Sequence, residues 1–224
     1  MTELEVEIPV AGGSVAATWT VPDSPRGMVA FAHGSGSSRY SPRNRVVAME
    51  LQSGGLATLL VDLLTPTEER LDEATGELRF DIPFLAERLV DAIDWLGEGD
   101  RRALPLGLFG ASTGAAAALL AASHRTGLIR AVVSRGGRPD LAGSALGRVG
   151  APVLLVVGAR DEVVVGLNQR ALAQLAVRSE LVVVPNATHL FPEPGAIERV
   201  AALARAWVER HMLGGAAHPP LHGA

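Results

Sequence analysis

The chain has 224 residues, of which 48% are hydrophobic, and this length and composition are typical of one globular domain with a sizeable core. It contains no cysteine and no lysine, which excludes disulfides, thiolate metal sites, a cysteine nucleophile, Schiff-base chemistry and a P-loop lysine. The formal net charge of −4 gives no support for a nucleic-acid surface, so no nucleic-acid partner is expected.

The N-terminal segment is acidic and lacks the basic start and apolar core of a secretion signal. No apolar run approaches the roughly 18–20 residues that are needed to cross a membrane. We therefore expect a soluble, cytoplasmic protein without a membrane partner, and the absence of cysteine suits a reducing compartment.

The predicted strands are short, and most of them alternate with helical patterns. Residues 4–8 and 14–21 alternate like strands, and Gly12-Gly13 between them predicts a hairpin turn. Six further strands are predicted at residues 27–32, 56–61, 104–109, 129–133, 153–157 and 180–184. Helices are predicted over residues 43–52, 82–96, 113–123, 167–177 and 196–212.

This alternation predicts an α/β fold with a mostly parallel eight-stranded sheet and helices on both faces. The opening hairpin is expected at one edge of the sheet. Residues 1–213 are predicted to form a single domain, and residues 214–224 are expected to be a disordered tail.

The run at residues 104–109 ends at Gly110-Ala111-Ser112-Thr113-Gly114, and an alanine-rich helical pattern follows at once. Strand, tight turn and helix form the context in which Gly-x-Ser-x-Gly makes a nucleophile elbow. The serine there has a strained backbone, so the residues two before and two after it must be small. Ser112 is therefore predicted to be a nucleophile above the C-terminal end of the sheet; the alternative is a packing turn without chemistry.

Two further loops supply a predicted acid and base. Asp161 follows the strand at residues 153–157, where it could accept a hydrogen bond from a histidine and fix its tautomer. Glu162 is the competing acid, and Asp161 could instead cap a helix that starts near Val165 or Gly166. His189 follows the last strand and completes the chain order Ser, Asp, His, although a lone histidine in a loop is usually inert.

The glycine-rich loop His33-Gly-Ser-Gly36 follows the strand at residues 27–32. The backbone N–H groups of Ser35 and Thr113 are predicted to form an oxyanion hole, in which one donor stabilises the transition state by roughly 3 kcal/mol. His33 is interpreted as a structural residue that supports the loop by side-chain hydrogen bonds. The loop lacks the Gly-Lys-Ser/Thr ending of a P-loop, which counts against nucleotide binding.

Arg135 and Arg138 follow the strand at residues 129–133, on the same predicted edge. Most surface arginines are solvated or paired with carboxylates. Our hypothesis is that one of these two binds an anionic group of the substrate bidentately.

With these loops taken together, the chain resembles the α/β-hydrolase superfamily, and within it small members of the dienelactone hydrolase-like group. The resemblance covers residues 3–212 and rests on four motifs: His33-Gly-Ser-Gly36, Gly110-Ala-Ser-Thr-Gly114, Gly158-Ala-Arg-Asp161 and Ala187-Thr-His189. Dienelactone hydrolases carry a cysteine at the elbow, whereas this chain has Ser112, which favours a serine esterase. The pattern is also similar to the hydrolase portion that is fused to phosphoribosyltransferases in some actinobacteria.

Residues 134–151 are too short for the large helical cap that many members of this superfamily carry. Residues 64–81 are the better candidate for a partial cover, because Thr65-Pro-Thr-Glu-Glu69 is a helix-start signal. No large cap domain is therefore expected.

The residues and the resemblance together predict a serine hydrolase of carboxylic esters that acts through an acyl-enzyme and needs no metal or cofactor. The expected partner is a small-molecule ester, and the sequence leaves a homo-oligomer open. Alternatives are a thioesterase, lactonase or small-peptide hydrolase with the same triad, or a non-catalytic interaction module that keeps the fold.

Overall fold

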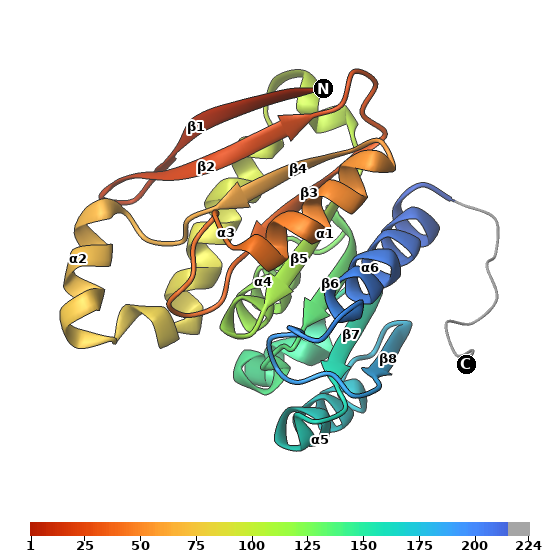
Figure 1. Ribbon diagram of the computed structural model, residues 1–224. Helices are drawn as coiled ribbons and strands as arrows, with labels where there is room; N and C mark the ends of the chain where they lie inside the picture. Colours follow the sequence, from red (N-terminus) through yellow and green to blue (C-terminus); the bar gives the residue numbers. More distant parts are fainter. Residues whose placement is uncertain (215–224) are drawn as a thin grey trace.

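An eight-stranded sheet forms the centre of the computed structural model, which describes residues 1–214 (Figure 1). Its strand order is β1-β2-β4-β3-β5-β6-β7-β8. The strands are β1 (Thr2–Val10), β2 (Gly13–Val21), β3 (Gly27–Ala32), β4 (Leu56–Val61), β5 (Leu106–Ala111), β6 (Ile129–Arg135), β7 (Val153–Gly158) and β8 (Ser179–Val184). Only the β1–β2 and β2–β4 pairs are antiparallel, so the predicted mostly parallel sheet with an edge hairpin is confirmed.

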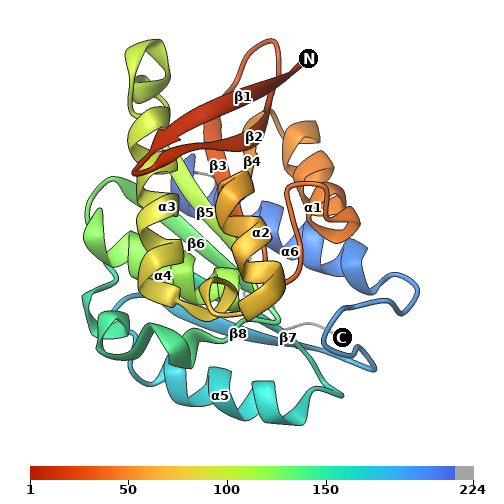
Figure 2. The same cartoon turned by 90° about the vertical axis from the view of Figure 1, so that its left-hand side faces the viewer.

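Helices cover both faces of the sheet, as expected from its apolar strands (Figure 2). The helices are α1 (Pro42–Ser53), α2 (Pro66–Thr75), α3 (Ile82–Leu96), α4 (Thr113–His124), α5 (Glu162–Leu172) and α6 (Ala196–Met212). α1 and α6 pack on one face, and α3, α4 and α5 pack on the other. Neighbouring residues of one strand pack on opposite faces of the sheet. Leu155 of β7 belongs to the core under α3, α4 and α5, whereas Leu154 and Val156 belong to the core under α1 and α6.

α2 is the one helix of the described residues that lies across the C-terminal ends of the parallel strands, toward the viewer in Figure 2. The helix begins at the predicted helix-start signal, with Thr65 as the residue that caps its N-terminus. The Thr65 hydroxyl accepts the N–H of Glu68, and the Glu68 carboxylate accepts the N–H of Thr65, which together make a capping box. No large cap is present in the described residues, and only short 3₁₀ turns (Pro139–Arg148) separate β6 from β7.

The prediction of a helix over residues 167–177 was wrong at both ends. α5 begins directly at Glu162 and ends at Leu172, because the chain turns into the helix immediately after β7. The strand predicted at residues 104–109 lies two residues later, since β5 runs on to Ala111 at the elbow. The predicted tail, residues 214–224, lies outside the described residues except for Gly214.

Candidate active site

Ser112 lies between β5 and α4 with φ 52° and ψ −120°, a backbone conformation that L residues rarely adopt. Its N–H donates to the carbonyl of Arg135 (3.1 Å), and its own carbonyl accepts the N–H of Arg138 (3.1 Å). The chain after β6 therefore holds the turn on both sides. A Cβ atom on Gly110 would overlap the backbone of Ala115, which explains why the first glycine of the motif has no side chain.

His189 and Asp161 are in contact, with 2.6 Å between Nδ1 of the imidazole and Oδ2 of the carboxylate. Because an ionised carboxylate only accepts hydrogen bonds, this contact favours the neutral tautomer of His189 with its proton on Nδ1 and a lone pair on Nε2. Asp161 precedes the first residue of α5, yet its side chain makes no capping hydrogen bond. The capping alternative for Asp161 is therefore wrong, and the carboxylate is directed to His189.

Close backbone packing positions the loop that carries His189. A Cβ atom on Gly158, the last residue of β7, would lie 2.7 Å from the carbonyl oxygen of Thr188. Gly136, which follows β6 at φ +50°, would place a Cβ atom 3.6 Å from Cε1 of His189. The imidazole thus lies beside the segment that also holds the Ser112 turn.

Glu193 is a supporting residue that no motif in the sequence predicts. One of its carboxylate oxygens, Oε1, accepts both the N–H (3.0 Å) and the hydroxyl (2.7 Å) of Thr188, the residue before His189. Hydrogen bonding from Thr188 lowers the pKa of Glu193, so the carboxylate stays ionised and closes the loop. No spacing pattern in the sequence marks this contact.

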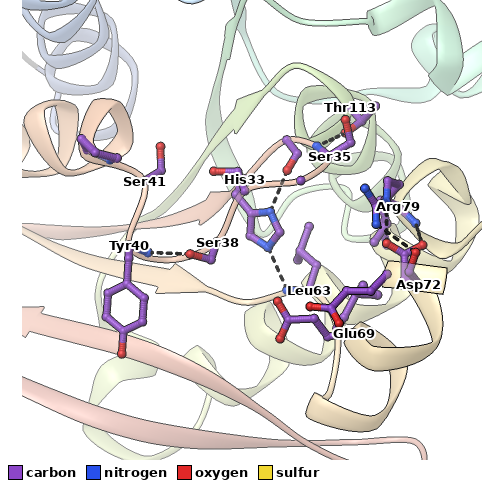
Figure 3. Close-up of a pocket in the computed structure, with 17 residues that line it drawn as sticks. His33, Ser35, Ser38, Tyr40, Ser41, Leu63, Glu69, Asp72, Arg79 and Thr113 are labelled. Atoms are coloured by element: carbon purple, nitrogen blue, oxygen red, sulfur yellow. Dashed lines mark hydrogen bonds and ion pairs between the residues drawn. The ribbon is translucent and has the colours of Figure 1, made fainter. Parts of the chain in front are cut away.

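The two predicted oxyanion donors lie together, although one of them has a partner. The N–H of Ser35 donates to the side-chain hydroxyl of Thr113 at 2.9 Å (Figure 3). The N–H of Thr113 belongs to the first turn of α4, where backbone donors have no acceptor within the helix. A carbonyl oxygen of a ligand could reach the Ser35 donor only by replacing the Thr113 hydroxyl.

His33 supports the same loop. Its Nδ1 lies 2.9 Å from the carbonyl of Gly34, and its Nε2 accepts the N–H of Leu63 at 3.2 Å (Figure 3). Burial lowers the pKa of His33, and the hydrogen bond to Gly34 and the nearby carboxylates only partly oppose this effect. These contacts agree with the structural role that is predicted for His33 from the sequence.

A cavity of about 460 Å³ opens next to Thr113 and Ser35 (Figure 3). The loop from His33 to Pro42 forms one wall, and α2 with the segment after it forms the other. On the α2 side the carboxylate of Asp72 is buried and ion-paired with Arg79, at 2.6 Å between Oδ2 and Nε. Part of the segment at residues 64–81 therefore lines the cavity beside Ser35 and Thr113.

The two arginines singled out in the sequence have different environments. Arg138 forms two hydrogen bonds with the carboxylate of Asp140, at 2.9 and 2.8 Å. Arg135 is buried, and its Nη2 donates to the side-chain oxygen of Asn44 at 3.4 Å. Neither arginine lines the cavity beside Thr113.

Within residues 1–214, no group of three or more His, Cys, Asp or Glu side chains could hold a metal ion. None of the helices described there is long and apolar enough to cross a membrane.

Comparison with known proteins places the chain in a family. Residues 63–213 match the model of the dienelactone hydrolase family. A dienelactone hydrolase from Anabaena variabilis has 53% sequence identity and a TM-score of 0.92, and the match covers 94% of this chain and 98% of that one. Est1E from Butyrivibrio proteoclasticus shares the fold at 16% identity and a TM-score of 0.78, over 93% and 99% of the two chains.

A Mycobacterium tuberculosis protein is 57% identical over 211 residues, and its name offers phosphoribosyl transferase as a provisional assignment. The match covers 94% of this chain but only 47% of that relative, so the chain spans about half of the relative's length. The family match and the solved structures support a hydrolase with the α/β-hydrolase fold, and the chain belongs to the dienelactone hydrolase family.

Proposed function

We propose that the chain is a serine hydrolase of carboxylic esters in which Ser112 is the nucleophile, His189 the general base and Asp161 the orienting carboxylate. The observation that carries this proposal is the 2.6 Å contact between His189 Nδ1 and Asp161 Oδ2 at the strand ends that also carry the strained Ser112 turn. Such a contact leaves Nε2 free to accept a proton, which is the property a general base needs.

The reaction proceeds in two halves. Nε2 of His189 takes the proton of the Ser112 hydroxyl as Oγ attacks the ester carbonyl carbon, and the tetrahedral oxyanion accepts the N–H of Thr113. The N–H of Ser35 becomes a second hydrogen-bond donor to the oxyanion when the Thr113 hydroxyl moves away from it. The carbon–oxygen bond to the alcohol then breaks, and the alcohol leaves with the proton from His189.

Water completes the second half. His189 removes a proton from a water molecule, the resulting hydroxide attacks the acyl-serine, and the acid is released as Ser112 regains its proton. Asp161 holds the imidazole in place and stabilises its cation in both halves. The cavity of about 460 Å³ beside Thr113 is the proposed location of one side of the ester.

Phosphoribosyl transfer is not proposed for this chain. More than half of the Mycobacterium tuberculosis relative lies outside the match, and this chain itself matches the dienelactone hydrolase family. A cytoplasmic location and a small-molecule ester as partner stay predictions from the sequence. Thioesters, lactones and small peptides are the alternative substrates for the same triad.

A fluorophosphonate probe tests the proposal, because only an activated serine reacts with it. We expect labelling of the wild-type protein and of Ser144→Ala, which changes an exposed serine, and no labelling of Ser112→Ala. Hydrolysis of p-nitrophenyl acetate should follow the same pattern. Labelling that persists in Ser112→Ala would refute the nucleophile, and an unreactive wild-type protein would favour the non-catalytic module. Comparing the hydrolysis rates of esters, thioesters and lactones then identifies the preferred class of substrate.

A further inference from the structure

Arg135 carries a buried charge without a carboxylate partner. It is the last residue of β6, the residue is 6% exposed, and its Nε has no hydrogen-bond acceptor. Among the described residues, no carboxylate oxygen lies within 4.0 Å of its guanidinium group, and the Asn44 contact is long at 3.4 Å. A buried charge normally requires a partner, because the interior does not replace the hydration that the charge has lost.

A second cation precedes Asn44, the residue that the Arg135 side chain contacts. Arg43, in the first turn of α1, is half-buried, and its Nε is also enclosed without an acceptor. Burial in the first place, and the charge of Arg43 in the second, lower the pKa of Arg135 to about 10. The first turn of α1 contains no acidic residue, so the positive end of the helix dipole adds to the same field.

This positive region adjoins the candidate triad. The carbonyl of Arg135 accepts the N–H of Ser112, and the next residue, Gly136, packs against the ring of His189. Asn44, which contacts the Arg135 side chain, lies one residue after Arg43 in α1. The main chain of Arg135 thus lies beside the nucleophile turn, and its side chain reaches the start of α1. The cavity under α2 is a different region that neither arginine lines.

We propose that Arg135 and Arg43, at the N-terminus of α1, form a subsite for a carboxylate or phosphate group of the substrate. The inference rests on the proposed function, because it assigns this group to the ester that Ser112 attacks. An oxyanion there would accept the unpartnered N–H donors and offset both charges, which Asn44 alone cannot do. Arg138, the other arginine of the motif, already has this type of partner in Asp140.

Access to the subsite is through Arg43. It lines a surface cavity of about 280 Å³ between α1 and the segment before α6. Two carboxylates, Glu193 and Glu198, line the same cavity. Oε1 of Glu193 accepts two hydrogen bonds from Thr188. Neither carboxylate forms an ion pair with Arg43 in the described part of the chain.

Matched substrates test the subsite. The ratio of kcat/KM for monomethyl glutarate to that for dimethyl glutarate compares an anionic ester with a neutral one. Arg135→Gln and Arg43→Gln should each lower this ratio about tenfold or more, as expected for a lost charged hydrogen bond. Arg125→Gln, at the far end of α4 and ion-paired with Asp94, should leave it unchanged. An unchanged ratio in both test variants, or a fall in Arg138→Gln alone, would overturn the proposal.

A binding measurement separates this proposal from the proposed function. Inorganic phosphate should raise the melting temperature of the wild-type protein and of Ser112→Ala, and should do so less in Arg43→Gln, whose half-buried side chain can be replaced without leaving a cavity in the core. A protein that binds phosphate but hydrolyses no ester would refute the esterase and keep the anion site. Phosphate stabilisation without any effect of ester charge would show a site for a free anion and refute the substrate assignment. Absence of both effects would refute the subsite altogether.

Discussion

Gly114 packs so closely against the carbonyl group of His33 that a Cβ atom on the glycine would overlap the carbonyl oxygen. The first turn of α4 is thereby held against the end of β3. The same approach brings the hydroxyl of Thr113 to 2.9 Å from the N–H of Ser35. One glycine therefore sets the spacing between the nucleophile turn and the loop that supplies the proposed oxyanion donors.

Gly114→Ala should destabilise the protein although it lies in a helix, where alanine normally stabilises by about 1 kcal/mol relative to glycine. The added methyl group must push the His33 carbonyl away, and overpacking of this kind costs about 1–3 kcal/mol. Urea unfolding measures the effect. Gly147→Ala is the matched control, because a Cβ atom there would meet only the carbonyl of Gln174 at 4.0 Å. Equal stability of the two variants would contradict the close packing.

Asp161→Asn should lower kcat by about 10⁴-fold, because the amide no longer fixes the tautomer in which Nε2 of His189 accepts a proton. The free energy of unfolding should change little, since Asp161 does not cap α5. Ester hydrolysis and the rate of fluorophosphonate labelling measure the change. Glu162→Gln removes the competing acid and should leave both rates near wild type. A greater loss in Glu162→Gln would reassign the orienting carboxylate.

The positions of Ser112, Asp161 and His189 at strand ends could be predicted, because each of these residues follows a continuous apolar run. In a parallel sheet the loops that follow these strands lie at the same edge. Chain order and strand spacing therefore suffice to predict that the three residues lie near one another. The contact between His189 and Asp161 is consistent with that expectation.

Contacts between side chains distant in sequence could not be predicted in the same way. The start of α5 depends on the turn after β7, in which the N–H groups of Ala159 and Arg160 donate to the carbonyls of Val184 and Ala187, far along the chain. The Ser35–Thr113 hydrogen bond and the Glu193 contact with Thr188 arise from the packing of separate loops. The burial of Arg135 likewise depends on α1, because its side chain contacts Asn44, which lies ninety-one residues earlier in the chain.

His33→Gln should make stability less dependent on pH. Histidine in the unfolded chain titrates near 6.5, and burial lowers the pKa of His33 in the folded protein. Above pH 6.5 both states are neutral, and the contribution of His33 is fully present. Below this value the unfolded state binds a proton that the folded state does not, so the free energy of unfolding falls until the folded pKa is reached.

Urea unfolding of wild type and His33→Gln between pH 7.5 and 5 measures this difference. The variant curve should be flatter below pH 6.5. It should not become level, because burial also lowers the pKa of His211 and contributes in the same direction. His211→Gln is therefore the comparison variant. Parallel curves for wild type and His33→Gln would contradict a buried neutral His33.

Ser112→Gly should be more stable than Ser112→Ala by about 1 kcal/mol, although both lack the nucleophile. At φ 52° and ψ −120° a Cβ atom is strained, and glycine removes this strain, which amounts to roughly 1–3 kcal/mol for such residues. The larger conformational entropy of glycine in the unfolded chain offsets part of the gain, by about 0.5–1 kcal/mol. Comparing the two variants cancels the loss of the hydroxyl group, so urea unfolding reports the net effect of the Cβ atom at this position. If the alanine variant proves the more stable, the turn is not strained at Ser112, and the demand for small neighbours in the motif loses its physical basis.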